Sequence, residues 1–260
     1  MIKGLAIDMD GTVYKGSVPI PGAKEFISSL NRNGIPYMFV TNNSSKGRKQ
    51  YYNKLKGMGF DIDMRNVLTS GTAALRFLKD NRPGKKVYVI GTESYMEDVK
   101  EYGIELSDDD PDIVLLSFDR ELTYEKINKG YMFIKNGAEY IATHPDDLCP
   151  TEDDYDVDIG AFIAMYTYLL KKEPLIIGKP NRLLLDMAAA EMGIRPEEIA
   201  MVGDRLYTDM KMAVDNGMSS ILVLSGETSE EDLKDTEIRP TYVLGSVDEI
   251  MEKVFGIPHD

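Results

Sequence analysis

Short apolar runs recur along the chain, and each leads through a polar or glycine-containing turn into an amphipathic segment. Apolar runs without alternation are typical of strands buried on both faces of a parallel sheet. They predict strands at residues 4–7, 35–40, 67–68, 87–90, 112–116, 140–143, 199–202, 220–224 and 242–244. The segments between them predict helices at residues 21–33, 47–58, 71–79, 93–102, 123–136, 160–171, 181–192, 207–216 and 247–254. This alternation predicts an α/β fold with a Rossmann-like, doubly wound parallel sheet and helices on both faces.

Two breaks divide the pattern. The first is Asn81-Arg82-Pro83-Gly84, after which the strand-then-helix order starts afresh, and the second is Lys172-Glu173-Pro174. Residues 81–177 carry 21 acidic and 10 basic side chains, whereas the rest of the chain carries 23 and 20. A change of charge between two breaks indicates a separate unit. The sequence therefore predicts a core domain formed by 1–80 and 178–260, with a smaller α/β domain, 81–177, inserted into it.

Composition excludes several classes of function. The net charge of -14 argues against nucleic acid or an anionic membrane as a partner, because both attract a basic surface. The single cysteine, Cys149, excludes an internal disulfide framework and a cysteine-rich zinc site. Met1-Ile2-Lys3-Gly4 leads directly into the first predicted strand and leaves no room for a signal peptide, so we expect a cytoplasmic protein. A homo-oligomer is compatible with the sequence.

Polar clusters follow the apolar runs at four places: Asp8 and Asp10, then Thr41-Asn42-Asn43, then Lys179, then Asp204 and Asp209. The carboxyl ends of parallel strands share one edge of a sheet, so we expect the four clusters to converge there. Each has an ordinary explanation by itself. Asp-x-Asp-Gly is common in surface turns, a Thr-Asn run often caps a helix, and Lys179-Pro180 suits a solvated helix start. Their joint occurrence at matching strand ends favours an active site.

The side chains in these clusters suit phosphoryl transfer. Its transition state is anionic, and it is stabilised by positive charge and oriented donors. Asp8 and Asp204 are hard oxygen ligands that suit Mg²⁺. Lys179 supplies a point charge, and the Thr41 hydroxyl with nearby main-chain N–H groups can bind phosphate oxygens. Asp209 is near the start of a helix, where it can support the metal's ligands.

These motifs resemble those of the haloacid-dehalogenase superfamily, in its phosphatase branch. Asp8-Met9-Asp10-Gly11-Thr12 is similar to the first family motif, Thr41-Asn42-Asn43 to the second, and Gly178-Lys179-Pro180 to the third. Gly203-Asp204 through Thr208-Asp209 is similar to the fourth. The insertion after the second motif resembles the α/β cap of subclass IIA, the group of nucleotide, sugar-phosphate and p-nitrophenyl phosphatases.

The resemblance implies a Mg²⁺-dependent phosphatase that hydrolyses a small phosphorylated metabolite, a sugar phosphate or a nucleoside monophosphate. Asp8 would attack phosphorus to give an aspartyl-phosphate, and Asp10 would act as general acid and then as general base. Mg²⁺ would bind the Asp8 carboxylate, the Asp10 main-chain carbonyl and Asp204. Asp209 would support the metal or Lys179. Because Asp10 must hold a proton, we expect its surroundings to raise its pKa.

Substrate choice would depend on the insertion. Ala142-Thr143-His144-Pro145-Asp146 resembles a family segment that often has Asn where this chain has His144, which makes His144 and Asp146 candidate specificity residues. The acidic run 152–158 is expected to be a solvated loop. Two rival functions stay open: a phosphotransferase or mutase, which passes the phosphate to another hydroxyl, and a phospho-receiver switch without turnover.

Overall fold

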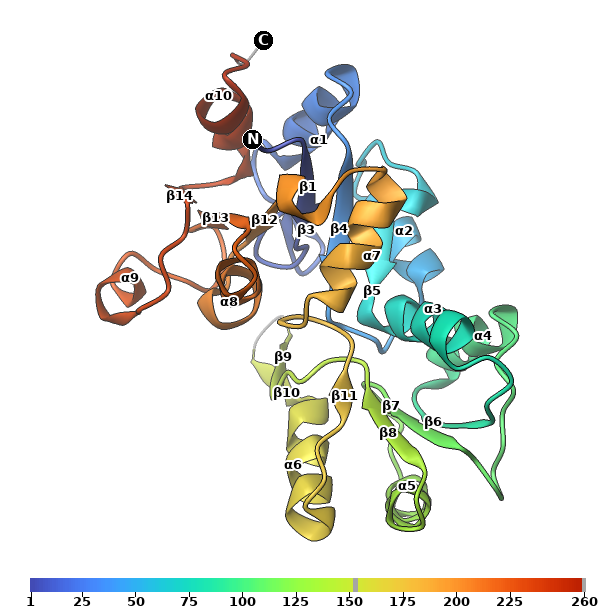
Figure 1. Ribbon diagram of the computed structural model, residues 1–260. Helices are drawn as coiled ribbons and strands as arrows, with labels where there is room; N and C mark the ends of the chain where they lie inside the picture. Colours follow the sequence, from blue (N-terminus) through green and yellow to red (C-terminus); the bar gives the residue numbers. More distant parts are fainter. Residues whose placement is uncertain (152–153, 259–260) are drawn as a thin grey trace. The chain divides into compact units, whose positions relative to one another are not determined.

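The computed structural model describes residues 1–151 and 154–258 (Figure 1). The chain forms two compact units. The first contains Met1–Val40, Tyr51–Leu68 and the described residues from Pro180 onward, and the second contains Thr41–Gln50 and the described part of Thr69–Lys179. By contacts, the second unit thus includes two segments, 41–50 and 69–80, that precede the insertion predicted at 81–177.

A six-stranded sheet forms the centre of the first unit. Its strand order is β14-β13-β12-β1-β4-β5, and the pairs β1–β12, β1–β4, β12–β13 and β13–β14 are parallel. Strand β1 therefore lies between β4, which follows it in the chain, and β12, which comes far later. The bounds are β1 Gly4–Ile7, β4 Tyr37–Thr41, β5 Val67–Thr69, β12 Ile199–Gly203, β13 Ser219–Val223 and β14 Tyr242–Leu244.

Helices cover both faces of this sheet. Leu5 and Ile7 of β1 belong to a buried cluster that includes Phe26 and Ile27 of α1. On the opposite face, a Cβ atom at Gly4 would lie 2.5 Å from Ile194, just beyond α7. The sheet is thus doubly wound, in agreement with the sequence. The helices are α1 Ala23–Arg32, α2 Arg48–Gly57, α7 Leu183–Met192, α8 Lys211–Asp215, α9 Asp232–Asp235 and α10 Ile250–Phe255.

The second unit has a parallel sheet of its own, with the order β11-β8-β7-β6. Its buried cluster includes Tyr140 and Tyr166, whose rings meet edge to face at 5.7 Å. The strands are β6 Val87–Ile90, β7 Ile113–Leu116, β8 Glu139–Ala142 and β11 Leu175–Ile176, and the helices are α3 Ser70–Asn81, α4 Glu93–Glu101, α5 Tyr124–Lys135 and α6 Ile159–Leu170.

Several local features differ from the sequence predictions. Two short antiparallel hairpins are present, β2 (Tyr14–Lys15) with β3 (Val18–Pro19), and β9 (Leu148–Pro150) with β10 (Tyr155–Val157). The helix predicted from residue 207 begins as a π-helical turn, Leu206–Met210, before α8.

The acidic run 152–158 differs from expectation at its end. Residues 152 and 153 lie outside the described part of the chain. The expectation of a loop is wrong at Tyr155–Val157, which form β10, and the expectation of a solvated side chain is wrong at Asp158. That side chain is buried and caps α6, because its carboxylate accepts a hydrogen bond from the Ile159 N–H at 2.7 Å. Among the described residues, no helix combines the length and apolarity needed to span a bilayer.

Candidate active site

The centre of the site is where β1 and β12 end side by side. Ile7 pairs with Val202, and the Asp8 N–H donates to the Val202 carbonyl at 2.8 Å. Strands β4 and β5 lie on one side of β1, and the later strands β12, β13 and β14 lie on its other side. The strand order therefore changes direction at β1. The carboxyl ends at such a change of direction are where open α/β sheets bind ligands.

Three buried carboxylates meet at this point. Asp8, Asp204 and Asp209 each offer an oxygen atom, and these atoms all lie within 4.8 Å of one another. Burial raises the pKa of Asp204, and the negative charges of Asp8 and Asp209 raise it further. A divalent cation would relieve this repulsion, and carboxylate oxygens are the ligands that Mg²⁺ prefers. The residues therefore fit the metal that the sequence predicts.

Asp204 is held closely by its neighbours in the first unit. One carboxylate oxygen accepts from the Thr12 hydroxyl at 3.3 Å, and the other accepts from the Glu227 N–H at 2.7 Å. Gly11 and Gly226 leave room for the same carboxylate, because a Cβ atom at either position would overlap with it. The loop that contains Gly226 and Glu227 is part of the site, although no sequence motif marked it.

Asp209 is brought to the cluster by the π-helical turn. Its carboxylate accepts from the Arg205 N–H at 3.3 Å, and a Cβ atom at Gly203 would overlap with it. We expected Asp209 to support the metal from outside its ligands. Its position in the carboxylate cluster also makes it a direct candidate ligand.

Asp10 lies in the tight turn after β1. The Met9 carbonyl accepts from the N–H groups of Thr12, Val13 and Tyr14, which fixes the turn. Burial raises the pKa of Asp10, and the nearby charge of Asp8 also raises it, whereas the cations Lys54 and Arg205 lower it. The net direction is upward, which suits a carboxyl group that must carry a proton.

Sequence reasoning missed the two cations near Asp10. Lys54 comes from α2, and its ammonium group lies 3.9 Å from the centre of the Tyr14 ring. Arg205 follows Asp204 directly and forms an ion pair with Glu227 at 3.0 Å. Arg205 could have been predicted, because it lies in the fourth motif directly after Asp204. Nothing in the sequence distinguishes Lys54 from other lysines on predicted helices.

In the second unit, Asn42 and Lys179 are joined by their main-chain and amide groups. The Asn42 carboxamide oxygen accepts from the Lys179 N–H at 2.8 Å, and its NH₂ group donates to the Lys179 carbonyl at 2.9 Å and to Asp146 at 2.8 Å. A Cβ atom at Gly178 would lie 2.5 Å from this carboxamide oxygen. Asn42 thus fixes the main chain of Lys179, and Gly178 permits the close approach.

Thr41 and Asn43 form a local turn. The Thr41 hydroxyl accepts from the Asn43 N–H at 3.2 Å, and the Asn43 side-chain oxygen accepts from the N–H and hydroxyl of Ser45 at 3.0 and 2.7 Å. The NH₂ group of Asn43 lies 3.3 Å from the Cys149 sulfur. These bonds set the shape of the loop after β4.

His144 is fully buried in the second unit. Its Nε2 lies 3.1 Å from an Asp158 oxygen, and its Nδ1 lies 3.0 Å from the Thr143 hydroxyl. The structure therefore gathers Asp8, Asp10, Asp204 and Asp209 within the first unit. Within the second it gathers Asn42, Lys179, Asp146 and His144, with Thr41 and Asn43 in the adjoining loop.

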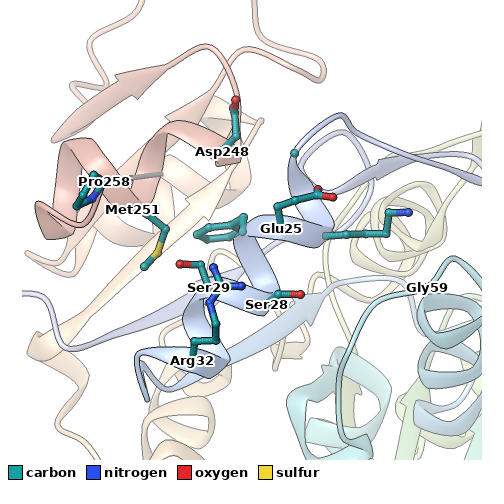
Figure 2. A pocket seen from close by; sticks show the side chains of 11 residues that line it. Glu25, Ser28, Ser29, Arg32, Gly59, Asp248, Met251 and Pro258 are labelled. Carbon is teal, nitrogen blue, oxygen red and sulfur yellow. The ribbon is translucent and has the colours of Figure 1, made fainter. Parts of the chain in front are cut away.

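The first unit also has a hollow of about 690 Å³ between α1 and the C-terminal region (Figure 2). Its lining includes Glu25 and Asp248 together with Arg32, so it presents both signs of charge. Gly22 is also among the lining residues, and a Cβ atom at this position would lie 2.6 Å from Asp248. None of the predicted site residues is among its lining residues.

Comparisons with known proteins agree over nearly the whole chain. A family model described as haloacid dehalogenase-like hydrolase matches residues 5–105, and one described as HAD-hydrolase-like matches residues 176–250. The 5'-nucleotidase YutF of Bacillus subtilis is 35% identical over 247 residues, which is 95% of this chain and 96% of that protein.

Two further relatives are similarly close. An acid sugar phosphatase of Staphylococcus saprophyticus is 32% identical over 253 residues, which is 97% of this chain and 98% of that protein. The crystal structure of a 4-nitrophenylphosphatase from Thermotoga maritima superposes with a TM-score of 0.94 at 38% identity, and covers 97% of both chains.

Proposed function

The chain belongs to the haloacid dehalogenase-like hydrolases, in their phosphatase branch, and we propose that it cleaves its substrate through an aspartyl-phosphate on Asp8 with the help of Mg²⁺. It is a hydrolase of phosphoric monoesters. The names of its relatives support a small phosphorylated metabolite as substrate, either a sugar phosphate or a nucleoside monophosphate.

The observation that carries this proposal is the buried carboxylate cluster beside Asp10. Asp8 attacks phosphorus, and the bond from phosphorus to the leaving oxygen breaks as Asp10 gives its proton to that oxygen. Asp10, now a carboxylate, removes a proton from a water molecule as the water oxygen forms a bond to phosphorus. The bond from Asp8 to phosphorus then breaks, and inorganic phosphate leaves. The raised pKa of Asp10 favours the protonated form that the first step requires.

The metal would be held by the carboxylates of Asp8, Asp204 and Asp209 and by the Asp10 carbonyl, and when bound it would supply positive charge to the phosphoryl group. We assign to Lys179, in the second unit, the role of supplying a positive charge to the phosphate or to Asp8. Asn42 acts on it indirectly, because its carboxamide is occupied by the Lys179 main chain. Thr41 and Asn43 shape the loop that offers N–H groups to phosphate oxygens.

The test is release of inorganic phosphate from p-nitrophenyl phosphate, sugar phosphates and nucleoside monophosphates with Mg²⁺. We expect Asp8→Asn to abolish turnover while the circular dichroism spectrum is unchanged. Asp10→Asn should lower kcat by about 10²- to 10⁴-fold, the usual contribution of a general acid. EDTA should stop the reaction.

The matched control is Asp215→Asn, which makes the same change on α8 where Asp215 pairs with Lys211 and is half exposed. This variant should keep full activity. Turnover that survives in folded Asp8→Asn would refute the nucleophile assignment. Phosphate release that requires an added hydroxyl acceptor would indicate a phosphotransferase instead.

A further inference from the structure

His144 has polar partners on both ring nitrogens, although it has no exposed surface. Nε2 lies 3.1 Å from the Asp158 oxygen that also accepts from the Ile159 N–H. Nδ1 lies 3.0 Å from the Thr143 hydroxyl and 3.4 Å from the Ser70 hydroxyl. Which ring nitrogens can carry a proton depends on which of these partners can accept one.

The partners can accept a proton from each nitrogen. The Asp158 carboxylate accepts, so Nε2 carries a proton. Ser70 has one hydroxyl proton, and it donates that proton to the Asn42 carbonyl, which can only accept. Towards His144 Ser70 can then only accept, and the Thr143 hydroxyl can also accept when its own proton points to Ser44. The network therefore accommodates a proton on both nitrogens, as in an imidazolium ion.

The charges near His144 agree with this state. Asp158 and Asp146 are the acidic groups that act on it, and Lys179 is the cationic one. With a neutral His144, the buried Asp158 carboxylate would lack the cationic partner that lies 3.1 Å from it, which is costly in a low-dielectric interior.

A short chain of hydrogen bonds leads from His144 to Lys179. Ser70 connects the imidazole to the Asn42 main chain, and the Asn42 carboxamide binds both main-chain groups of Lys179. Asp146 approaches the same carboxamide at 2.8 Å. A change in the charge of His144 is thus transmitted through Ser70 to Asn42, the residue that holds the Lys179 main chain.

We propose that His144, held as an imidazolium by Asp158, is a positioning residue that sets the Lys179 ammonium group through Ser70 and Asn42, so that turnover declines when His144 loses its proton. The effect on turnover rests on the function proposed above for Lys179. The proton on His144 is a property of the second unit alone and can be measured separately.

The direction of the pH effect follows from the surroundings of His144. Burial lowers the pKa of His144, but the charge and hydrogen bond of Asp158, with the charge of Asp146, outweigh it and raise the pKa above its usual 6.5. A raised pKa stabilises the folded protein below pH 6.5, and this contribution is lost as the pH rises through the folded-state value. Lys179 should lose its fixed position over the same pH range, as His144 loses its proton.

The experiment compares two titrations. The chain has two histidines, so His259→Gln leaves a single imidazole signal in the NMR spectrum, that of His144. We expect its midpoint above pH 6.5. In the same protein, kcat for p-nitrophenyl phosphate with Mg²⁺ should fall on the alkaline side with the same midpoint, by about 10-fold, since displacements of about 1 Å can cost up to about 10²-fold.

Two variants test the connection. His144→Asn cannot become charged, so kcat should be low at all pH values and the decline with the midpoint of the His144 signal should vanish. Ser70→Ala should weaken the decline although the His144 signal still titrates. A decline that keeps this midpoint in His144→Asn would belong to another group and would overturn the proposal.

Other outcomes separate this proposal from the function itself. An NMR midpoint below pH 6.5 would overturn the imidazolium assignment whatever the activity. If no phosphate is released by the unaltered protein, the proposed function fails, whereas the titration still reports on His144. If His144→Asn does not fold, the coincidence of the two midpoints in His259→Gln decides, because that protein retains His144.

Discussion

Gly11, Gly203 and Gly226 surround the carboxylates of Asp204 and Asp209 so closely that any side chain at these positions would collide with them. Asp204 also accepts hydrogen bonds from Thr12 and Glu227. The carboxylates are thus fixed before any ligand arrives. Such preorganisation is what electrostatic catalysis requires, because charged groups that must move at the moment of reaction lose part of their effect.

Gly226→Ala tests this close packing. The added methyl group would displace the Asp204 carboxylate, and we expect kcat to fall by about 10- to 100-fold, as for other displacements of about 1 Å in active sites. The measurement is phosphate release as a function of Mg²⁺ concentration, since a displaced ligand should also weaken metal binding.

The matched control is Gly57→Ala at the end of α2, where a Cβ atom meets nothing within 4 Å. That variant should retain full activity. Equal activity of Gly226→Ala and Gly57→Ala would show that the space beside Asp204 does not matter.

The residue types at strand ends were predictable, whereas their detailed roles were not. Asp8 and Asp204 were recognisable because each directly follows a buried apolar run. The use of the Asn42 carboxamide to bind the Lys179 main chain was not, because a hydrogen bond between residues 137 positions apart has no local sequence pattern. Lys54 was missed for the same reason.

At the level of elements, three helices of the second unit begin with a threonine cap. The hydroxyls of Thr69, Thr92 and Thr123 accept from the N–H group three residues later in α3, α4 and α5. An N-terminal cap satisfies a main-chain donor that has no partner within the helix.

Thr123→Ala is the cleanest test of a cap, because Thr123 is exposed and its hydroxyl accepts only from Lys126 among the bonds described, at 3.2 Å. We expect a loss of about 0.5–2 kcal/mol of stability. Thermal unfolding monitored by circular dichroism should show a lower midpoint. Thr123→Ser retains the oxygen and should unfold close to the parent protein; equal midpoints for all three would contradict the cap.

The strands and longer helices were predictable because hydrophobic period and turn residues are local properties. The hairpins β2–β3 and β9–β10 were missed because their strands have only two or three residues each. The π-helical turn at Leu206–Met210 has an ordinary helix pattern in the sequence. The π-helical turn brings Asp209 to the carboxylates of Asp8 and Asp204. This placement depends on tertiary structure, which the local sequence pattern does not reveal.

At the scale of the whole molecule, the net charge of -14 makes stability depend on counter-ions. General screening by salt weakens the repulsion between surface charges. The cluster of Asp8, Asp204 and Asp209 adds a specific demand for a cation, since its carboxylates are buried and close together. These two contributions can be separated.

Mg²⁺ should raise the unfolding midpoint more than NaCl does at equal ionic strength. A ligand that binds only the folded state adds about 2.7 kcal/mol at about 100 times its Kd. In Asp204→Asn the specific increase should disappear and only the general salt effect should remain. The same increase in both proteins would show that Mg²⁺ stabilises the chain elsewhere. EDTA should return the parent protein to its metal-free midpoint.

The pairing of β1 with β12 also has a consequence for how the chain folds. Thr12 and Asp204 are hydrogen-bonded partners that lie 192 positions apart, so their contact closes a very long loop. Contacts of this kind form late, because the entropy of loop closure must be met before they contribute. During synthesis, Asp8, the proposed nucleophile, emerges long before Asp204. Until Asp204 has emerged, the nascent chain carries Asp8 without the carboxylate cluster around it, and we expect catalytic competence only after that point.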